Sequence, residues 1–167
     1  MKKFSLLLTA VLVIAFALFA LGSGETAPEV KDQGSAGIAA ATTTPGAIGK
    51  YSVLIDSCRL AKDYEGDPVV IVKYIYSNVS DSNPTAFYIA FDDNVFQDGV
   101  GLNSAYVLSD NANYSSDNQT KEIKAGATLE VEVAYELNDT TTDIEVEVKE
   151  LFSFDNTVIT KTFSIAE

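Results

Sequence analysis

A short apolar run, residues 67–78, constrains the fold of this chain more than any other feature. Asp67-Pro68 opens the run, Ser77-Asn78 closes it, and the residues between are nearly all β-branched or aromatic. Such residues favour pleated structure, and a run that is apolar on both faces is typical of an interior strand. We therefore predict a central strand with a core face of Val70, Val72, Tyr74 and Tyr76. The opposite face, which carries Lys73, is expected to be the more exposed one.

Further short strands with turn signals recur on both sides of this run, at roughly ten-residue spacing. The alternation changes parity at Asp56-Ser57, which predicts a β-bulge there. Residues 87–96 are expected to form a strand interrupted at 92–94, and residues 105–108 a short one. The strand that begins at Ile144 is expected to keep Phe152 and Phe154 inward and to turn at Asp155-Asn156. Together these patterns predict an all-β chain of about seven or eight short strands, which is typical of a sandwich or a small barrel. We expect an antiparallel immunoglobulin-like β-sandwich, although the Cys…Trp…Cys signature is absent and the likeness rests on architecture alone.

The chain divides into three segments by composition. Residues 1–22 hold Lys2-Lys3, an apolar stretch and then Ala20-Leu21-Gly22, which together are typical of a cleaved secretory signal peptide. An uncleaved membrane anchor is the alternative, since the stretch is just long enough to span a bilayer. Residues 23–49 are rich in small residues and Pro and lack periodicity, which predicts a flexible linker. Residues 50–167 then form the β-sandwich domain.

Composition excludes several classes of function. The chain has no histidine, so a Ser-His-Asp or Cys-His site cannot form within it. Cys58 is the single cysteine, which excludes an intramolecular disulfide and a thiolate zinc site, and we expect it to be buried as a small hydrophobe. A free reactive thiol or an intermolecular bridge is the alternative. The residues after position 22 include 9 basic and 24 acidic ones, a net charge of −15, so nucleic acid is not expected as a partner.

Three sequence motifs resemble those of a known family. They are the strand from Val69 to Tyr74 that ends in Ser77-Asn78, then Phe96-Gln97-Asp98-Gly99, and then the segment 124–131. In these the chain resembles a family of uncharacterised exported domains of Gram-positive bacteria, many of whose members look like lipoproteins. The resemblance implies a fold similar to that of the mycobacterial immunoprotective extracellular antigen, an immunoglobulin-like sandwich, and it implies no catalytic residues. Ser23 stands where a lipoprotein signal would have its cysteine.

Carboxylates supply the candidate metal ligands. If the strands around residues 130 and 145 form a hairpin, their outward glutamates would lie side by side, and oxygen ligands suit calcium. The segment around Asp92 to Asp98 is a second oxygen cluster with partial likeness to a calcium loop. Ordinary solvated strands and turns are the competing interpretation for both sets. The weak candidates are Asp92, Asp93, Asp98, Glu130, Glu132, Glu145 and Glu147.

Three tyrosines are the candidate interaction surface. Tyr88 has the parity opposite to its apolar neighbours, Tyr106 lies in a short expected strand, and Tyr114 lies in the long polar tract 109–120. Exposed aromatic side chains form platforms for sugars or peptides, although scattered surface tyrosines are also ordinary. We expect all three to face solvent.

The sequence predicts an exported, secreted or cell-surface domain that binds an unknown protein or cell-wall ligand. It is expected to be a monomer that is not an enzyme, needs no cofactor and touches a membrane only through an uncleaved N-terminal segment. Two alternatives stay open. One is a carboxylate-based extracellular enzyme, which would require two acidic side chains converging in a concave pocket. The other is a structural or antigen-like surface domain without a specific ligand.

Overall fold

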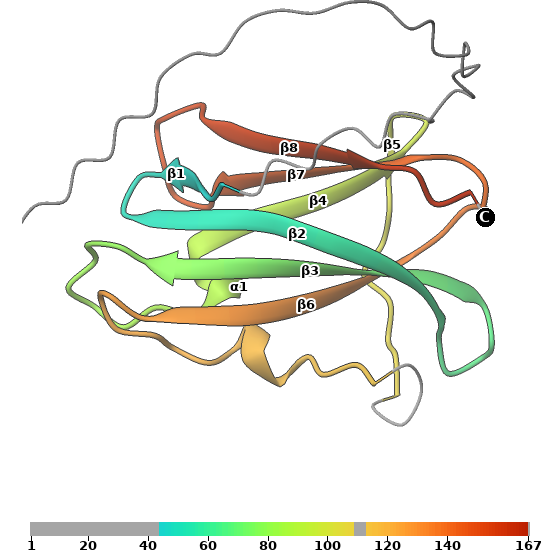
Figure 1. The fold of residues 1–167 in the computed structure, drawn as a ribbon, viewed down its shortest axis with the longest axis horizontal. Helices are drawn as coiled ribbons and strands as arrows, with labels where there is room; N and C mark the ends of the chain where they lie inside the picture. The colour runs from blue at the N-terminus through green and yellow to red at the C-terminus, as the bar shows by residue number, and fades with distance from the viewer. Residues whose placement is uncertain (1–43, 109–112, 167) are drawn as a thin grey trace, which may run out of the picture. The chain divides into compact units, whose positions relative to one another are not determined.

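The computed structural model describes residues 44–108 and 113–166, and these residues form two four-stranded antiparallel sheets (Figure 1). The predicted signal peptide and the linker up to residue 43 lie outside the described residues. One sheet has the order β1-β2-β3-β6 and the other the order β5-β4-β7-β8. The strands are β1 (Gly46–Ile48), β2 (Tyr51–Lys62), β3 (Pro68–Asn78), β4 (Phe91–Gln97), β5 (Val100–Gly101), β6 (Thr128–Glu136), β7 (Ile144–Glu150) and β8 (Val158–Phe163).

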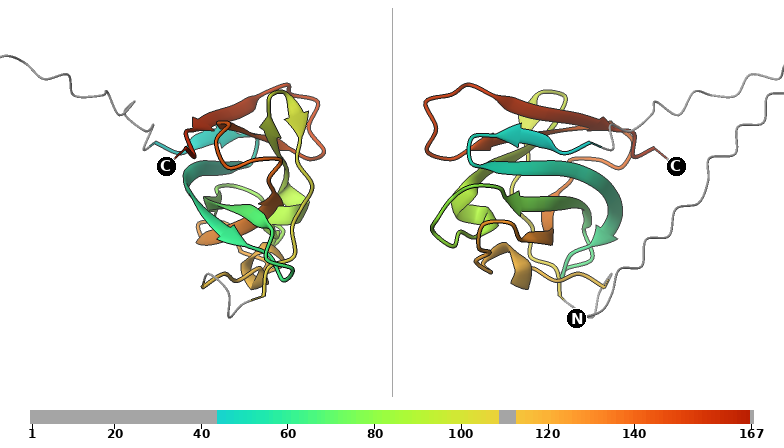
Figure 2. Two further views of the ribbon diagram at one scale, coloured as in Figure 1. Left: turned by 90° about the vertical axis from the view of Figure 1, so that its right-hand side faces the viewer. Right: turned by 60° about the vertical axis from the view of Figure 1, so that its left-hand side comes forward.

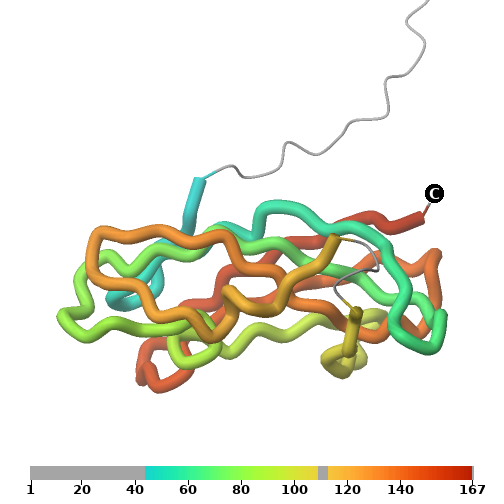
Figure 3. Tube along the Cα trace, turned by 90° about the horizontal axis from the view of Figure 1, so that it is seen from below, coloured from blue at the N-terminus to red at the C-terminus, as the bar shows by residue number. Residues whose placement is uncertain are grey.

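The two sheets face each other across one apolar core, which confirms the predicted antiparallel β-sandwich (Figures 2 and 3). The helical elements in the described part of the chain are the single turn α1 (Phe87–Ala90) and the 3-10 turn η1 (Asp117–Gln119). Within residues 44–108 and 113–166, no helix is long and apolar enough to cross a membrane.

Strand β3 is the central strand that the apolar run predicts, since it pairs with β2 on one side and with β6 on the other. Its core face is completely buried, at 0% exposure for Val70, Val72, Tyr74 and Tyr76. Burial of one such side chain contributes about 1.5–3 kcal/mol to folding. The prediction for the other face holds only in part. Lys73 and Ile75 are half-buried, but Val69 and Ile71 are completely buried because they pack in one cluster with Val107, Tyr114 and the cross-strand neighbour Ala134.

The first hairpin begins before the expected domain boundary at Lys50. Ile48 pairs with Tyr51 across a turn in which Gly49 has φ +56°, and the sheet therefore starts at Gly46 rather than after the predicted linker.

The predicted bulge in β2 is confirmed by a register shift between Ile55 and Ser57. Cys58 follows this bulge; it is a free thiol, half-buried against the core, and burial raises its pKa.

A lysine closes the seam between the sheets beside the bulge. Lys161 of β8 donates hydrogen bonds from Nζ to the carbonyl oxygens of Ile55 (2.9 Å) and Asp56 (2.7 Å) in β2. Its ammonium group also lies 4.6 Å from the centre of the Phe163 ring, an attractive cation–π geometry. Lys161 thus links strand β8 of one sheet to the bulged part of β2 in the other.

The predicted strand 87–96 is wrong at its start and in its interruption. Residues 87–90 form the helical turn α1, whose buried residues Phe87 and Ala90 are three apart. The alternation of apolar residues from Phe87 to Phe91 wrongly predicted a strand, because Phe87 and Phe91 are also four positions apart, a spacing that fits a helical turn. Strand β4 then runs unbroken through Asp92, which forms an ion pair at 2.8 Å with Lys149 of β7. The short strand expected at 105–108 is reduced to a single bridge between Ser104 and Tyr135.

The predicted course of the chain after β7 is also wrong. Strand β7 ends at Glu150, opposite Phe91, the first residue of β4, and β8 begins only at Val158. In the described part of the chain, no neighbouring strand pairs with residues 151–157. The alternation of apolar residues there therefore does not tell which side chains face the core. Phe152 and Phe154, expected inward, are 82% and 105% exposed.

Candidate binding pocket

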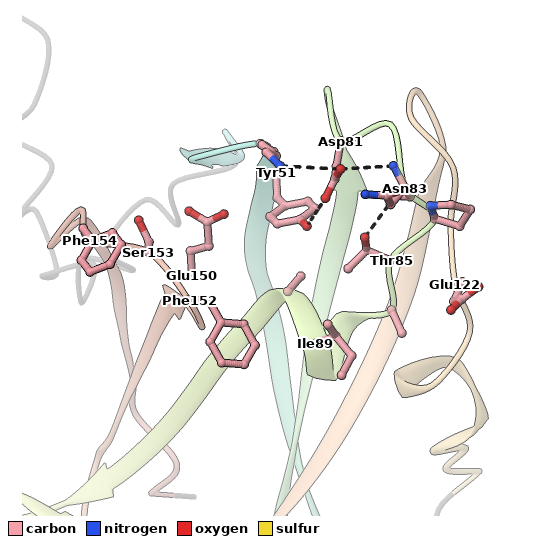
Figure 4. A pocket seen from close by; sticks show the side chains of 14 residues that line it. Tyr51, Asp81, Asn83, Thr85, Ile89, Glu122, Glu150, Phe152, Ser153 and Phe154 are labelled. Atoms are coloured by element: carbon pink, nitrogen blue, oxygen red, sulfur yellow. Dashed lines mark hydrogen bonds and ion pairs between the residues drawn. The ribbon is translucent and has the colours of Figure 1, made fainter.

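A pocket of 610 Å³ lies at the end of the sandwich where β2 begins and β7 ends (Figure 4). Segments from five parts of the sequence meet there: the start of β2, the turn after β3, α1, the segment before β6 and the β7–β8 loop. The lining residues are Lys50, Tyr51, Asp81, Asn83, Pro84, Thr85, Ala86, Ile89, Ala90, Glu122, Glu150, Phe152, Ser153 and Phe154.

The wall on the β3 side is held by Asn78, the residue that closes the apolar run. Asn78 is completely buried, accepts a hydrogen bond from the Asp81 backbone N–H (2.9 Å), and donates to the carbonyl oxygens of Ile123 (3.1 Å) and Asn83 (3.3 Å). Tyr76 donates to the Thr85 carbonyl oxygen at 3.0 Å. These bonds fix the turn after β3, so this wall of the pocket is preorganised.

Asp81 is a satisfied carboxylate in this wall. Its Oδ2 accepts a hydrogen bond from the Tyr51 hydroxyl (2.8 Å), its Oδ1 accepts one from the Asn83 N–H (3.1 Å), and Lys50 Nζ lies 3.7 Å away (Figure 4). The Asn83 N–H, together with the Tyr51 hydroxyl and Lys50, lowers the pKa of Asp81. Asp81 therefore stays ionised, and both of its carboxylate oxygens already have partners within this chain.

The other wall is apolar and open to solvent. It carries Phe152 and Phe154 on the β7–β8 loop, and Ile89 of α1, which is 44% exposed (Figure 4). None of the aromatic pairs in the described part of the chain involves either phenylalanine. Two large rings beside a concave surface are a typical feature of a recognition site.

Two glutamates complete the pocket without internal partners. Glu150 is half-buried at the end of β7, and Glu122 is exposed before β6. Across residues 44–108 and 113–166, neither carboxylate has an ion pair or a side-chain hydrogen bond. The unpaired charge of the pocket is therefore negative.

The predicted glutamate hairpin does not form. Glu130 and Glu132 lie on β6, which pairs with β3, whereas Glu145 and Glu147 lie on β7 in the opposite sheet. Residues 137–143 connect β6 in one sheet to β7 in the other instead of closing a hairpin. A short polar segment can make either connection, so the sequence does not distinguish them. Arg59 binds Glu132 through both carboxylate oxygens, so this candidate ligand forms an internal salt bridge.

The remaining acidic candidates have separate environments. Asp98 occupies the β4–β5 turn with φ +49°, next to Gly99, and lines a second pocket of 440 Å³ that also contains Glu145 and Glu147. Asp92 is paired with Lys149. Asp93 points between the sheets, where the Tyr135 hydroxyl donates to it and burial raises its pKa. The structure thus brings together three of the seven candidates.

An unpredicted acidic group lies in the β2–β3 loop. Among the described residues, Asp63, Glu65 and Asp67 have carboxylate oxygens within 4.8 Å of one another. However, Asp63 Oδ1 already accepts hydrogen bonds at 2.8–2.9 Å from the backbone N–H groups of Glu65, Gly66 and Asp67. The group therefore stabilises a turn, as the Asp-rich sequence of this loop predicts.

Two of the three candidate tyrosines are exposed, and one is not. Tyr88 is 53% exposed on α1, and Tyr106 is 69% exposed and contacts Tyr64 edge to face at 6.0 Å. Tyr114 is buried, at 7%, because its ring packs on the outer face of β3 and its hydroxyl accepts a hydrogen bond from Gln119 (3.1 Å). The polarity of the surrounding tract concealed this contact.

Sequence reasoning missed the pocket itself. The alternation predicts a core position for its apolar wall, Phe152 and Phe154, and no sequence motif marks Asp81, Glu122 or Glu150 as part of a site. One signal was present: Leu151-Phe152-Ser153-Phe154 directly precedes Asp155-Asn156, so large apolar residues border a turn. Apolar residues at a turn are those most exposed if the strand ends early.

Two solved structures are similar to this chain in fold. The first is described as a "putative lipoprotein" from Staphylococcus aureus; it has 21% sequence identity and a TM-score of 0.54, and the match covers 70% of this chain and 84% of that chain. The second, from Bacillus subtilis, has the same description, 14% identity and a TM-score of 0.56, with coverage of 73% and 38%. A search of curated proteins found no match.

The sequence itself matches one family over residues 26–150, which include the turn after β3, α1 and Glu150 of the pocket. The resemblance seen in the three sequence motifs is thereby confirmed. The chain belongs to the family described as "Domain of unknown function (DUF5067)".

Proposed function

We propose that this domain is a non-enzymatic, extracellular or cell-surface binding module, and that its ligand contacts the pocket beside Phe152 and Phe154. The observation that carries the proposal is the position of these two exposed rings at the mouth of a 610 Å³ pocket with a preorganised wall. A stable monomer seldom exposes large aromatic side chains together unless they serve recognition.

The extracellular location rests on different support. The N-terminal segment has the composition of an export signal, and the two structural neighbours are described as lipoproteins. An acidic surface suits a soluble exported domain. A position outside the membrane would leave the pocket accessible to proteins or wall polymers.

The arrangement favours binding over carboxylate catalysis. A glycosidase-like mechanism needs one carboxyl group with a raised pKa in the cleft. Here burial raises the pKa of Asp93, which lies between the sheets and lines neither the 610 Å³ nor the 440 Å³ pocket. The carboxylate of Asp81 in the pocket is shifted in the opposite direction.

Site-specific photo-crosslinking tests the proposal. The full chain would be produced in its native cells with benzoylphenylalanine in place of Phe154, and in separate samples in place of Tyr106 or Tyr88. We expect a discrete adduct from position 154 that is absent from position 106. Equal adducts from all three positions, or none from position 154, would contradict a pocket-centred binding role.

A further inference from the structure

The charges of the pocket indicate what kind of ligand it accepts. Four of its lining residues are charged, and Lys50 and Asp81 already face each other at 3.7 Å. Glu122 and Glu150 are left without a partner in the described part of the chain. A ligand that brings positive charge would therefore gain two unpaired carboxylates, whereas an anion would be repelled by them.

The apolar wall suits the same ligand. The stem of a lysine or arginine side chain is apolar and its head is charged, so it can lie along a ring while the head reaches a carboxylate. Aromatic faces also attract cations directly. This chain uses the pairing internally, since the Lys161 ammonium group lies 4.6 Å from the centre of the Phe163 ring.

The net charge of the chain after residue 22 acts in the same direction over a longer range. Residues 23–167 carry 24 acidic and 9 basic side chains. Such an excess attracts cationic partners and raises their association rate, more strongly at low salt. It also disfavours the anionic lipid surface as the partner for the two phenylalanines.

We propose that the pocket binds a cationic segment of a partner protein, with one lysine or arginine head at Glu150 and a second at Glu122, which lie on opposite sides of the pocket (Figure 4), and an apolar neighbour against Phe152 and Phe154. The inference rests on the proposed binding function and specifies the chemistry of its ligand.

Peptide titrations of the full chain followed by nuclear magnetic resonance test it. The probes are two acetylated and amidated tetrapeptides, Lys-Leu-Lys-Leu and Glu-Leu-Glu-Leu. We expect the lysine peptide to shift the resonances of Phe152, Phe154 and Glu150 in a saturable and salt-sensitive way. The glutamate peptide is expected to cause no shift there.

Matched variants separate a local effect from the general charge. Glu122→Gln with Glu150→Gln should weaken binding of the lysine peptide at least fivefold. Glu65→Gln with Glu145→Gln removes the same charge outside the pocket and should leave the affinity unchanged. Equal loss in both double variants would overturn the inference, because binding would then follow net charge alone.

Two further outcomes distinguish the alternatives. If both peptides shift Phe152 and Phe154 equally, the binding pocket stands and its cationic ligand is refuted. If vesicles of phosphatidylcholine with phosphatidylglycerol bind the chain, and Phe154→Ser abolishes that binding, the loop is a membrane contact and the inference is likewise refuted. If benzoylphenylalanine at position 154 gives no adduct in the photo-crosslinking experiment, the proposed binding function itself is refuted.

Discussion

Both ends of the sandwich expose aromatic and acidic side chains, but the two ends use them differently. At the end formed by the β2–β3 loop, Tyr64 contacts Tyr106, and the Asp63 carboxylate accepts three backbone hydrogen bonds. At the opposite end, where the β7–β8 loop lies (Figure 1), Phe152 and Phe154 are exposed and Glu122 and Glu150 have no partner in the described chain. Exposure alone is thus a poor guide to a site; unsatisfied groups are a better one.

The largest expected effect lies in the strand that supports both ends. Val72→Asp places a charge at a position with 0% exposure and no partner. We expect the domain not to fold, because the cost is comparable with a typical total stability of about 5–15 kcal/mol. Circular dichroism and thermal unfolding measure this. A soluble variant with cooperative unfolding would show that the core assignment of β3 is wrong.

The next largest change in the free energy of unfolding is expected for an acidic residue of the β2–β3 end, and not for one at the pocket end. Asp63→Ala removes the acceptor of three backbone N–H groups, so we expect a loss of about 1–2 kcal/mol in the free energy of unfolding. Glu150→Ala removes no hydrogen bond and should change it by less than about 0.5 kcal/mol. Urea unfolding of both variants compares them directly, and equal losses would abolish the distinction between the two ends.

Two aspartates should respond to pH in opposite directions. Burial raises the pKa of Asp93, so its contribution to stability is present below about pH 3.9, the unfolded value, and is lost as pH rises through the folded pKa. Neighbouring Asp92 also raises this pKa, while the Tyr135 and Tyr74 hydroxyls lower it. Asp93→Asn should therefore lose less stability than the wild type between pH 4 and pH 7.

Asp81 provides the contrast at the pocket. Its pKa is lowered, so its contribution is present above about pH 3.9 and is lost as pH falls through the folded pKa. Asp81→Asn should be less stable than the wild type at pH 7, and this difference should shrink in acid. Urea unfolding at pH 3, 4, 5 and 7 tests both variants. The same direction of pH dependence for both would contradict the assigned environments.

The smallest effect concerns the aromatic residues. Tyr64→Ser removes an edge-to-face contact and should cost about 0.5–1 kcal/mol. Phe152→Ser with Phe154→Ser should change the free energy of unfolding by no more than about 0.5 kcal/mol, because the rings are not buried. Denaturant titration measures both. A clear destabilisation by the phenylalanine variant would indicate a packing role and weaken the binding proposal.

The sequence predicted the framework better than the pocket, and the reason is physical. Alternation reports burial only where neighbouring strands define two faces, as they do for β3 and for the bulge at Asp56-Ser57. It failed at Phe87, where a helical turn gives a similar spacing, and at Phe152, where the ladder has ended. Glu122 and Glu150 are 28 positions apart in the sequence and lie in one pocket only through the fold.

The short strand β1 has a mechanical consequence. It pairs antiparallel to β2 over three residues, with Gly46 at the open end of the hairpin and Ile48 next to the turn. A force on Thr44 would therefore unzip the pairs one after another, which needs less force than shearing a ladder. The last pair to open is Ile48 with Tyr51, and Tyr51 lines the pocket and holds Asp81. Tension applied at Thr44 would therefore reach the wall of the pocket before the rest of the domain yields.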